Sequence, residues 1–198
     1  MTASEAGTVL VVDDDREVVR TYRRYLEGAY TIREAYDGAA ALDELDEDVD
    51  VVLLDRMMPG ASGEEVLAQI REQGVDVRVA MVTAVDPDFD IVDMGFDDYV
   101  TKPTTREELL RVVEDLLALD RHAVDVREYH SLLVKAAALR EGKSTYELDD
   151  NPAYADLEAR ISDLERTLDA EADQLVDDSR FVATLRAIDT APREDIDG

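Results

Sequence analysis

Thr8-Val9-Leu10-Val11-Val12-Asp13-Asp14-Asp15 joins a short, apolar and largely β-branched run to three successive carboxylates. Runs of this kind are typical of a strand that is buried on both faces of a parallel sheet. In the next segment, 16–27, apolar side chains recur at helical spacing until Gly28, and glycine commonly ends a helix. The stretch therefore predicts a buried strand, then a polar turn, then a helix.

The same order of strand and helix recurs four times further along the chain. The predicted pairs are 30–35 with 38–45, 51–54 with 63–70, 77–82 with a weak helix over 88–94, and 98–101 with 106–119. Five strands that alternate with five helices predict an α/β fold whose parallel sheet is covered on both faces. Parallel sheets bind ligands beyond the carboxyl ends of their strands. The polar residues that leave the first, third, fourth and fifth strands are therefore expected to converge: Asp13, Asp14, Asp55, Thr83 and Lys102.

The expected cluster suits phosphoryl transfer. Three carboxylates in one pocket repel one another unless a hard divalent cation such as magnesium lies between them. Asp55 can act as a carboxylate nucleophile, while Lys102 supplies a fixed positive charge and Thr83 a hydroxyl donor. Taken singly, residues 13–15 could be only a helix N-cap and Asp55 only a turn residue. Those alternatives do not account for the set as a whole.

Four separated motifs carry a family resemblance. They are Val11-Val12-Asp13-Asp14, Leu53-Leu54-Asp55-Arg56-Met57-Met58-Pro59-Gly60, Val82-Thr83-Ala84 and Tyr99-Val100-Thr101-Lys102-Pro103, each at a predicted strand end. With them, the segment over about 7–120 resembles the receiver domains of two-component response regulators. The resemblance implies a flavodoxin-like, doubly wound, five-stranded parallel sheet of order 2-1-3-4-5.

The resemblance also implies roles for the site residues. Asp55 is expected to accept a phosphoryl group from a sensor histidine kinase, and Thr83 and Lys102 are expected to contact that group. Magnesium is the implied cofactor. Its implied ligands are Asp13, Asp14, Asp55 and the main-chain carbonyl of Met57.

Two positions of the last motif have further interpretations. Tyr99 is either a core aromatic or the switch residue that turns inward in receivers when Thr83 moves toward the phosphoryl group. Pro103 matches a turn position where receivers have a cis peptide bond, although the sequence leaves the isomer of the Lys102–Pro103 bond open.

Composition narrows the class of protein. The chain holds 49 acidic and 21 basic residues, for a net charge of −28, and 30 of the acids are Asp while 18 of the basic residues are Arg. This balance resembles that of halophilic proteins, with an acidic mesophilic protein as the alternative. Its field is expected to repel nucleic acid unless a local basic patch or very high salt intervenes. Because there is no cysteine, disulfides, thiolate metal sites and thiol catalysis are excluded. No apolar run approaches membrane-spanning length and no secretory signal pattern is present, so we expect a cytoplasmic protein without membrane contact.

Beyond residue 119 the pattern becomes wholly helical. One helix is predicted up to Glu141-Gly142-Lys143-Ser144, and a second begins near Pro152, a residue favoured in the first helical turn. The second helix carries apolar residues at alternating steps of four and three: Leu157, Ile161, Leu164, Leu168, Leu175, Val182 and Leu185. Glu171 and Asp178 interrupt this heptad seam. We therefore expect a helical hairpin that frays after Val176, with a helical dimer as the alternative.

The hairpin resembles the HalX-type domain that follows receivers in haloarchaeal regulators. The predicted division is 1–7 disordered, 8–120 receiver, 121–188 HalX-like hairpin or coiled coil, and 189–198 disordered acidic tail. Residues 121–198 hold 10 basic and 19 acidic residues and lack a basic recognition helix. Output through an unknown downstream protein is therefore predicted, and a DNA-binding transcriptional regulator is the alternative. An enzyme with its own substrate is not expected, and His122 and His130 are interpreted as structural residues on helix surfaces.

Overall fold

A computed structural model describes residues 7–119 and 124–171, and of 169–171 only the backbone. The chain divides into two compact units, 1–121 and 122–198, and each is described here by itself. Of the segments predicted to be disordered, 1–7 and 189–198, only Gly7 is among the described residues, and its carbonyl oxygen accepts a hydrogen bond from Thr31 N at 3.1 Å.

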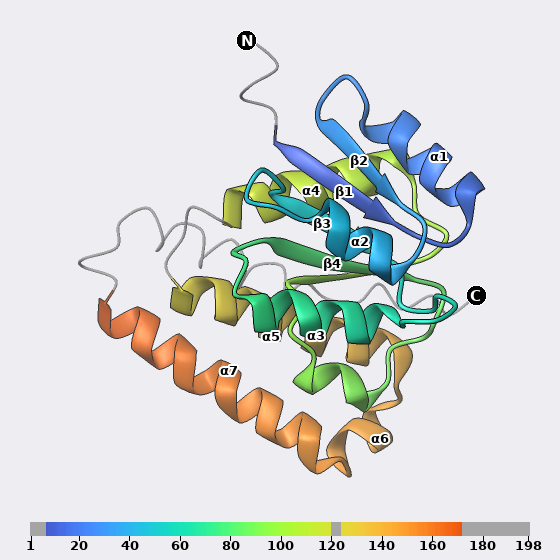
Figure 1. Cartoon of the computed structure of the whole chain (residues 1–198). Helices are drawn as coiled ribbons and strands as arrows, with labels where there is room; N and C mark the ends of the chain where they lie inside the picture. Colours follow the sequence, from blue (N-terminus) through green and yellow to red (C-terminus); the bar gives the residue numbers. More distant parts are fainter. Residues whose placement is uncertain (1–6, 120–123, 172–198) are drawn as a thin grey trace. The chain divides into compact units, whose positions relative to one another are not determined.

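The first unit contains a five-stranded parallel sheet of order β2-β1-β3-β4-β5. Its elements are β1 (Thr8–Val12), α1 (Arg16–Leu26), β2 (Thr31–Ala35), α2 (Gly38–Glu44), β3 (Val51–Leu54), α3 (Gly63–Gln73), β4 (Arg78–Thr83), the 3-10 helix η1 (Phe89–Asp93), β5 (Asp98–Thr101) and α4 (Arg106–Leu119). Figure 1 shows α1 and α4 along one face of the sheet and α2 and α3 along the other. The predicted fold class and strand order are confirmed.

The middle of the sheet is buried on both faces. Each residue of β3 is at most 1% exposed, as are Val9 to Val12 of β1 and Val79 to Val82 of β4. Apolar runs without alternation of polar residues fit this environment, because helices cover both faces of the sheet. The core therefore holds the carboxyl ends of β1, β3 and β4 at one rigid edge.

The turn after β1 shows which acidic residue caps the first helix. Asp15 has extended backbone angles and its side chain accepts a hydrogen bond from Glu17 N at 2.8 Å, as N-cap residues do. Its own N–H donates to Asp13 Oδ1 at 2.9 Å. The capping function therefore belongs to Asp15, and it does not explain the burial of Asp13.

The weak fourth helix of the predicted pattern is a short 3-10 helix. Residues 88–94 were expected to be α-helical, but η1 covers only Phe89–Asp93. Pro87 precedes this segment, Gly95 follows it, and three of its seven residues are Asp. Asp has low helix propensity, and the flanking Pro and Gly shorten any helix, so a single tight turn forms instead.

A buried ion network ties β4 to the turn before β5. The Asp97 carboxylate accepts hydrogen bonds from Arg71 at 2.8 Å, from Arg78 at 3.3 Å and from Val79 N at 2.8 Å. Arg71 also donates to the carbonyl oxygens of Gly95 and Val77, at 2.7 and 2.8 Å. The Asp97 carboxylate, which is 7% exposed, thus bridges two guanidinium groups, and Arg78 also pairs with Asp76.

The Asp98 carboxyl group is expected to make the free energy of unfolding depend on pH. Burial, followed by repulsion from Asp115, raises the pKa of Asp98 from 3.8 to about 7. Because the folded-state pKa lies above the unfolded one, this group stabilises the fold fully below about pH 4 and loses that contribution as pH rises toward 7. Asp98→Asn should therefore raise the free energy of unfolding at pH 8 by about 1–2 kcal/mol, since Asp98 is partly exposed, and leave it nearly unchanged at pH 4.5. Denaturant titrations of both proteins at the two pH values check this, and equal pH profiles would contradict it.

The second unit is a helical hairpin with a short helix at its turn. It consists of α5 (Val124–Gly142), α6 (Thr145–Asp149) and α7 (Pro152–Glu171). α5 packs against α7 through Val126, Tyr129, Leu133, Leu168, Ile161 and Leu164. The predicted hairpin and the start of its second helix at Pro152 are confirmed, while the expected fraying after Val176 lies outside the described residues.

Two features of this unit differ from expectation. α6 was not predicted, although Ser144 and Glu147 form a capping box, which a Ser-x-x-Glu pattern can reveal. His130 was expected on a helix surface, but it is 7% exposed, so that expectation is wrong. Among the described helices, none is long and apolar enough to cross a membrane.

Candidate functional site

Two buried carboxylates meet at the carboxyl edge of the sheet. Asp13 follows β1 and Asp55 follows β3, and these strands are hydrogen-bonded neighbours in which Val12 pairs with Leu54. Asp55 N donates to Val12 O at 2.9 Å, so the β1–β3 pairing carries on to the residue that bears the carboxylate. The exposed fractions of Asp13 and Asp55 are only 3% and 6%. Strand register alone therefore places two acids side by side.

Lys102 lies between these two carboxylates. It follows β5, and its backbone N–H donates to Thr83 O at 2.7 Å. Its Nζ donates to Asp13 Oδ2 at 2.5 Å and to Asp55 Oδ1 at 2.7 Å. The Lys102–Pro103 peptide bond is cis. Lys102 thus forms one ion-paired cluster with Asp55 and Asp13, which precede it by 47 and 89 positions in sequence.

The pKa values in the cluster reflect burial and pairing. Burial raises the pKa of Asp13 above its usual value, and the hydrogen bond from Lys102 offsets only part of this. Burial alone would lower the pKa of Lys102, but hydrogen bonds to Asp13 and Asp55 outweigh it and the pKa is raised. Lys102 is therefore a fixed cation at neutral pH.

The carboxylate oxygens of the acidic residues are suitable ligands for magnesium. Their present arrangement does not yet form a metal site. Asp14 is exposed, and within 7–119 and 124–171 there is no group of three acidic, His or Cys side chains placed to hold a metal. Each carboxylate oxygen of Asp13 and Asp55 already accepts one hydrogen bond, from Lys102, Asp15 N or Met57 N. A carboxylate oxygen has a second lone pair, and magnesium prefers oxygen ligands. The donor set can therefore hold the ion beside Lys102.

Thr83 and Tyr99 are linked through Val85. The Thr83 side chain is fully buried at the end of β4, and its Oγ1 accepts a hydrogen bond from Val85 N at 3.2 Å. The Tyr99 hydroxyl donates to Val85 O at 2.8 Å, and its ring contacts Phe96 with 5.6 Å between centroids. Tyr99 is half-buried. Its ring thus packs against an aromatic residue while its hydroxyl is tied to the loop that follows Thr83.

Sequence reasoning missed Arg56, the residue after Asp55. Arg56 is 6% exposed, and its Nε donates to Glu64 Oε1 at 2.6 Å. Its Nη2 donates to Asp90 of η1. Arginine is rarely buried unless paired, and nothing in the local pattern shows that the partners lie 8 and 34 residues away. Arg56 thus connects the loop after β3 to η1.

Gly63 is the second residue that sequence reasoning did not single out. A Cβ at Gly63 would lie 2.1 Å from the backbone oxygen of Asp55 and 3.0 Å from the Arg56 Cα. The N–H of Gly63 donates to Arg56 O at 2.9 Å. The first turn of α3 therefore supports the backbone of the Asp55 loop at a distance that only glycine allows.

Comparison with known proteins assigns the first unit. The family model described as the response regulator receiver domain matches residues 9–114. The chain belongs to this family. A second model, the HalX domain, matches residues 105–185, so this response regulator joins a receiver domain to a HalX domain.

Named relatives agree with the assignment. A Haloferax volcanii protein, provisionally named a transcriptional regulator, is 43% identical over 191 residues, which are 92% of this chain and 32% of that protein. The response regulator MprA of Mycobacterium tuberculosis is 43% identical over 114 residues, covering 55% of this chain and 50% of MprA. This chain thus spans about a third of the length of the Haloferax relative and half of the length of MprA.

Solved receiver structures share the fold of the first unit. The BeF3-activated DrrB receiver domain is 32% identical, with a TM-score of 0.52, over 57% of this chain and 97% of that chain. The response regulator TrrA of Thermotoga maritima, solved in complex with magnesium and BeF, is 33% identical, with a TM-score of 0.50, over 56% of this chain and 99% of that chain. Magnesium is therefore a ligand of a receiver relative.

Proposed function

We propose that this response regulator takes a phosphoryl group from a sensor histidine kinase onto Asp55 and signals through its C-terminal helical domain. The observation that carries the proposal is the contact of Lys102 Nζ with both Asp13 and Asp55, at 2.5 and 2.7 Å. A buried carboxylate beside a fixed cation is suited to accept an anionic group, because the cation offsets the added charge. Membership of the receiver family supports the same role.

The proposed chemistry uses side chains at this edge of the sheet together with the phosphohistidine of the kinase and a magnesium ion. One carboxylate oxygen of Asp55 forms the new bond to phosphorus while the bond from phosphorus to the kinase histidine nitrogen breaks. The Lys102 ammonium then pairs with a phosphoryl oxygen, and the Thr83 hydroxyl donates a hydrogen bond to another. Lys102 is within reach because it already contacts Asp55.

Magnesium is the proposed cofactor. Asp13, Asp14, Asp55 and the main-chain carbonyl of Met57 are the proposed ligands. When bound, the ion would neutralise charge on the phosphoryl oxygens during transfer. Asp13 and Asp55 would then divide their oxygens between the ion and Lys102, which their remaining lone pairs allow.

The proposed output is a contact with another protein. Movement of Thr83 toward the phosphoryl group would act on Val85, whose N–H donates to Thr83 and whose carbonyl accepts from Tyr99. We assign the receiver to 8–120 and the output domain to 121–188. The downstream protein, or a second copy of the chain, would be met in the cytoplasm, and the only catalysis would be the gain and loss of the phosphoryl group.

Asp55→Asn is expected to abolish phosphorylation. Because Asn lacks the carboxylate oxygen that would attack phosphorus, incorporation from an acyl phosphate donor with magnesium should fall at least about a hundredfold. Intact-protein mass spectrometry of the full chain checks this. Asp43→Asn, which changes an exposed acid on α2, serves as the matched control and should keep the wild-type rate. Equal incorporation by wild type and Asp55→Asn would overturn the assignment.

Control of transcription is the second candidate output, favoured by the provisional name of the Haloferax relative. The acidic balance of 121–198, with 10 basic and 19 acidic residues, argues against direct contact with DNA phosphates. Saturable, sequence-specific DNA binding by the phosphorylated full chain in molar salt would support this candidate over protein contact. Absence of such binding, together with capture of a protein that depends on phosphorylation, would support the leading proposal.

A further inference from the structure

Four arginines gather on one face of α1. Arg16, Arg20, Arg23 and Arg24 stand at i, i+4, i+7 and i+8, and therefore share a face of the helix. The whole chain has only 21 basic residues against 49 acidic ones. Like charges at i,i+4 destabilise a helix by roughly 0.2–0.5 kcal/mol per pair, and Arg16 also lies in the first turn, where positive charge is unfavourable. Arg23 and Arg24 lie in the last turn, where positive charge is favourable, and Arg20 and Arg23 pair with Glu17 and Glu27. The helix itself therefore accounts for part of the cluster but not for Arg16.

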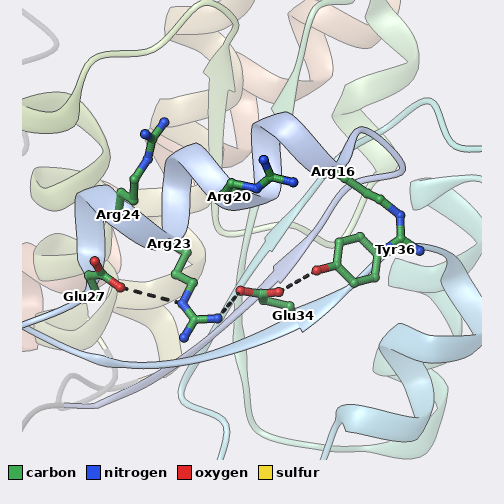
Figure 2. Close-up of a pocket in the computed structure, with 7 residues that line it drawn as sticks. All are labelled: Arg16, Arg20, Arg23, Arg24, Glu27, Glu34 and Tyr36. Carbon is green, nitrogen blue, oxygen red and sulfur yellow. Dashed lines mark hydrogen bonds and ion pairs between the residues drawn. The ribbon is translucent and has the colours of Figure 1, made fainter.

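These arginines line a hollow in the surface. Together with Glu27, Glu34 and Tyr36 they line a partly open hollow of about 400 Å³ beside α1 and the end of β2. Figure 2 shows these side chains. This volume lies within the roughly 300–1,000 Å³ that is typical of sites for small molecules. The hollow is separate from the cluster of Asp13, Asp55 and Lys102, none of which lines it.

The two acidic residues of the hollow are both directed at one arginine. Glu34 accepts hydrogen bonds from Arg23 at 2.8 Å and from the Tyr36 hydroxyl at 2.5 Å. Glu27 lies 3.6 Å from Arg23 Nε. These bonds, above all the one from Tyr36, lower the pKa of Glu34, so it remains a carboxylate. Arg23, Glu27 and Glu34 therefore form an ion-paired group of net charge −1 at one side of the hollow, and the other three arginines outweigh this charge.

The other three arginines also line the hollow, and in the described part of the chain none of them forms a hydrogen bond or ion pair with its two carboxylates. In Figure 2 the Arg24 side chain points away from Glu34 and Tyr36. Arg16 lies over the Tyr36 ring, 4.4 Å from its centroid. Arg20 pairs with Glu17, which is outside the hollow, and both side chains are more than half exposed. Arg24 donates to the Thr21 hydroxyl at 3.3 Å. In Figure 2, no dashed line joins Arg20 or Arg24 to Glu27 or Glu34. Three guanidinium groups thus retain donors for an anion.

We propose that this arginine hollow binds a small anion that carries several linked phosphate groups. The planar fork of a guanidinium group matches two oxygens of one phosphate, so three forks suit an anion with more than one phosphate. A nucleic acid or an acidic protein surface would bring its charge against the rest of a chain of net charge −28, whereas a small anion meets mainly the hollow. A free polyphosphate and the phosphate tail of a nucleotide share this chemistry. The site is independent of phosphorylation at Asp55.

The test is a titration of the full chain with inorganic tripolyphosphate at constant KCl concentration, with a chelator present to remove divalent ions. Calorimetry is expected to show saturable binding of one tripolyphosphate per chain. Arg20→Gln with Arg24→Gln should weaken this binding at least about tenfold, because two charge-assisted contacts are lost. Arg20→Lys with Arg24→Lys retains the charge but lacks the fork, and an intermediate loss is expected.

Matched controls separate the hollow from general charge effects. Arg106→Gln with Arg111→Gln removes the same charge from exposed positions on α4 and should change the affinity less than about twofold. Asp55→Asn should bind as wild type does, so failure of the phosphorylation proposal would leave this result intact. Denaturant unfolding of each variant confirms that it is folded, and the α1 variants should differ from wild type by less than about 1 kcal/mol, because the lost like-charge repulsion offsets the lost exposed Arg20–Glu17 pair.

The outcomes are distinct. If ATP displaces tripolyphosphate, the natural ligand is the phosphate tail of a nucleotide. If ATP does not displace it, the natural ligand is a free polyphosphate. Both results support the proposal. Absence of saturation, or an equal loss in the α1 and α4 variants, would overturn the proposal. Polyglutamate that binds as tightly as tripolyphosphate, at equal charge, would overturn it in favour of an acidic protein partner.

Discussion

Gly63→Ala is expected to lower the free energy of unfolding by about 2–4 kcal/mol, although it adds one methyl group to a helix. The added Cβ would lie 2.1 Å from the carbonyl oxygen of Asp55, so either α3 or the Asp55 loop must move. Because a backbone atom is the obstacle, no side-chain rotation relieves the contact. Displacement of the loop should also slow phosphoryl incorporation at Asp55. Equilibrium denaturation and intact-mass assays measure the two effects.

Gly74→Ala is the matched control for this change. Gly74 ends the same helix with a φ of 69°, and a Cβ there would have no neighbour within 4 Å. Its substitution should cost only about 1–2 kcal/mol through the left-handed backbone conformation and should leave phosphoryl incorporation unchanged. If the two variants lost similar stability and both incorporated phosphate normally, close contact at Gly63 would not be the constraint inferred above.

Asp97→Ala is expected to lower the free energy of unfolding by about 3–5 kcal/mol. The substitution leaves Arg78 and Arg71 without their shared carboxylate and removes the acceptor of Val79 N, all at buried or partly buried positions. Arg78 keeps its ion pair with Asp76, but Arg71 loses the carboxylate with which it pairs. Removal of one partner of a buried ion pair costs more than the pair itself contributes, so the effect is large. Chemical denaturation at pH 7 and fixed salt is the measurement.

Asp93→Ala provides a comparison for Asp97. Asp93 has the same side chain but is exposed on η1, and its loss should change stability by less than about 0.5 kcal/mol. A loss below about 1 kcal/mol for Asp97→Ala would show that water or rearranged side chains compensate the two arginines.

The sheet and its charged edge were predictable because they depend on local patterns. Buried strands without alternation predicted a parallel sheet, and the rule for strand ends then predicted that five residues would converge: Asp13, Asp14, Asp55, Thr83 and Lys102. The structure places Lys102 within hydrogen-bonding distance of Asp13 and Asp55, while Asp14 is exposed. Register between neighbouring strands determines these positions, and register follows from the apolar runs themselves.

What could not be predicted depends on contacts between distant segments. The burial of Arg56 requires Glu64 and Asp90 to approach from two other elements, and a single charged residue in sequence gives no sign of that. His130 was placed wrongly for a similar reason, since helical spacing assigns a face but not what covers that face. The Gly63 constraint is visible only once the distance to the Asp55 carbonyl is known.

The position of Lys102 has a consequence for how stability and signalling share one group. In the unmodified protein a single ammonium joins residues from β1, β3 and β5 at the edge of the sheet. Under the proposed function, the incoming phosphoryl group recruits this same ammonium, so part of the charge neutralisation comes from a cation that is already in place. A substitution of Lys102 would therefore change two properties together: the rigidity of the unmodified domain and its response to the kinase.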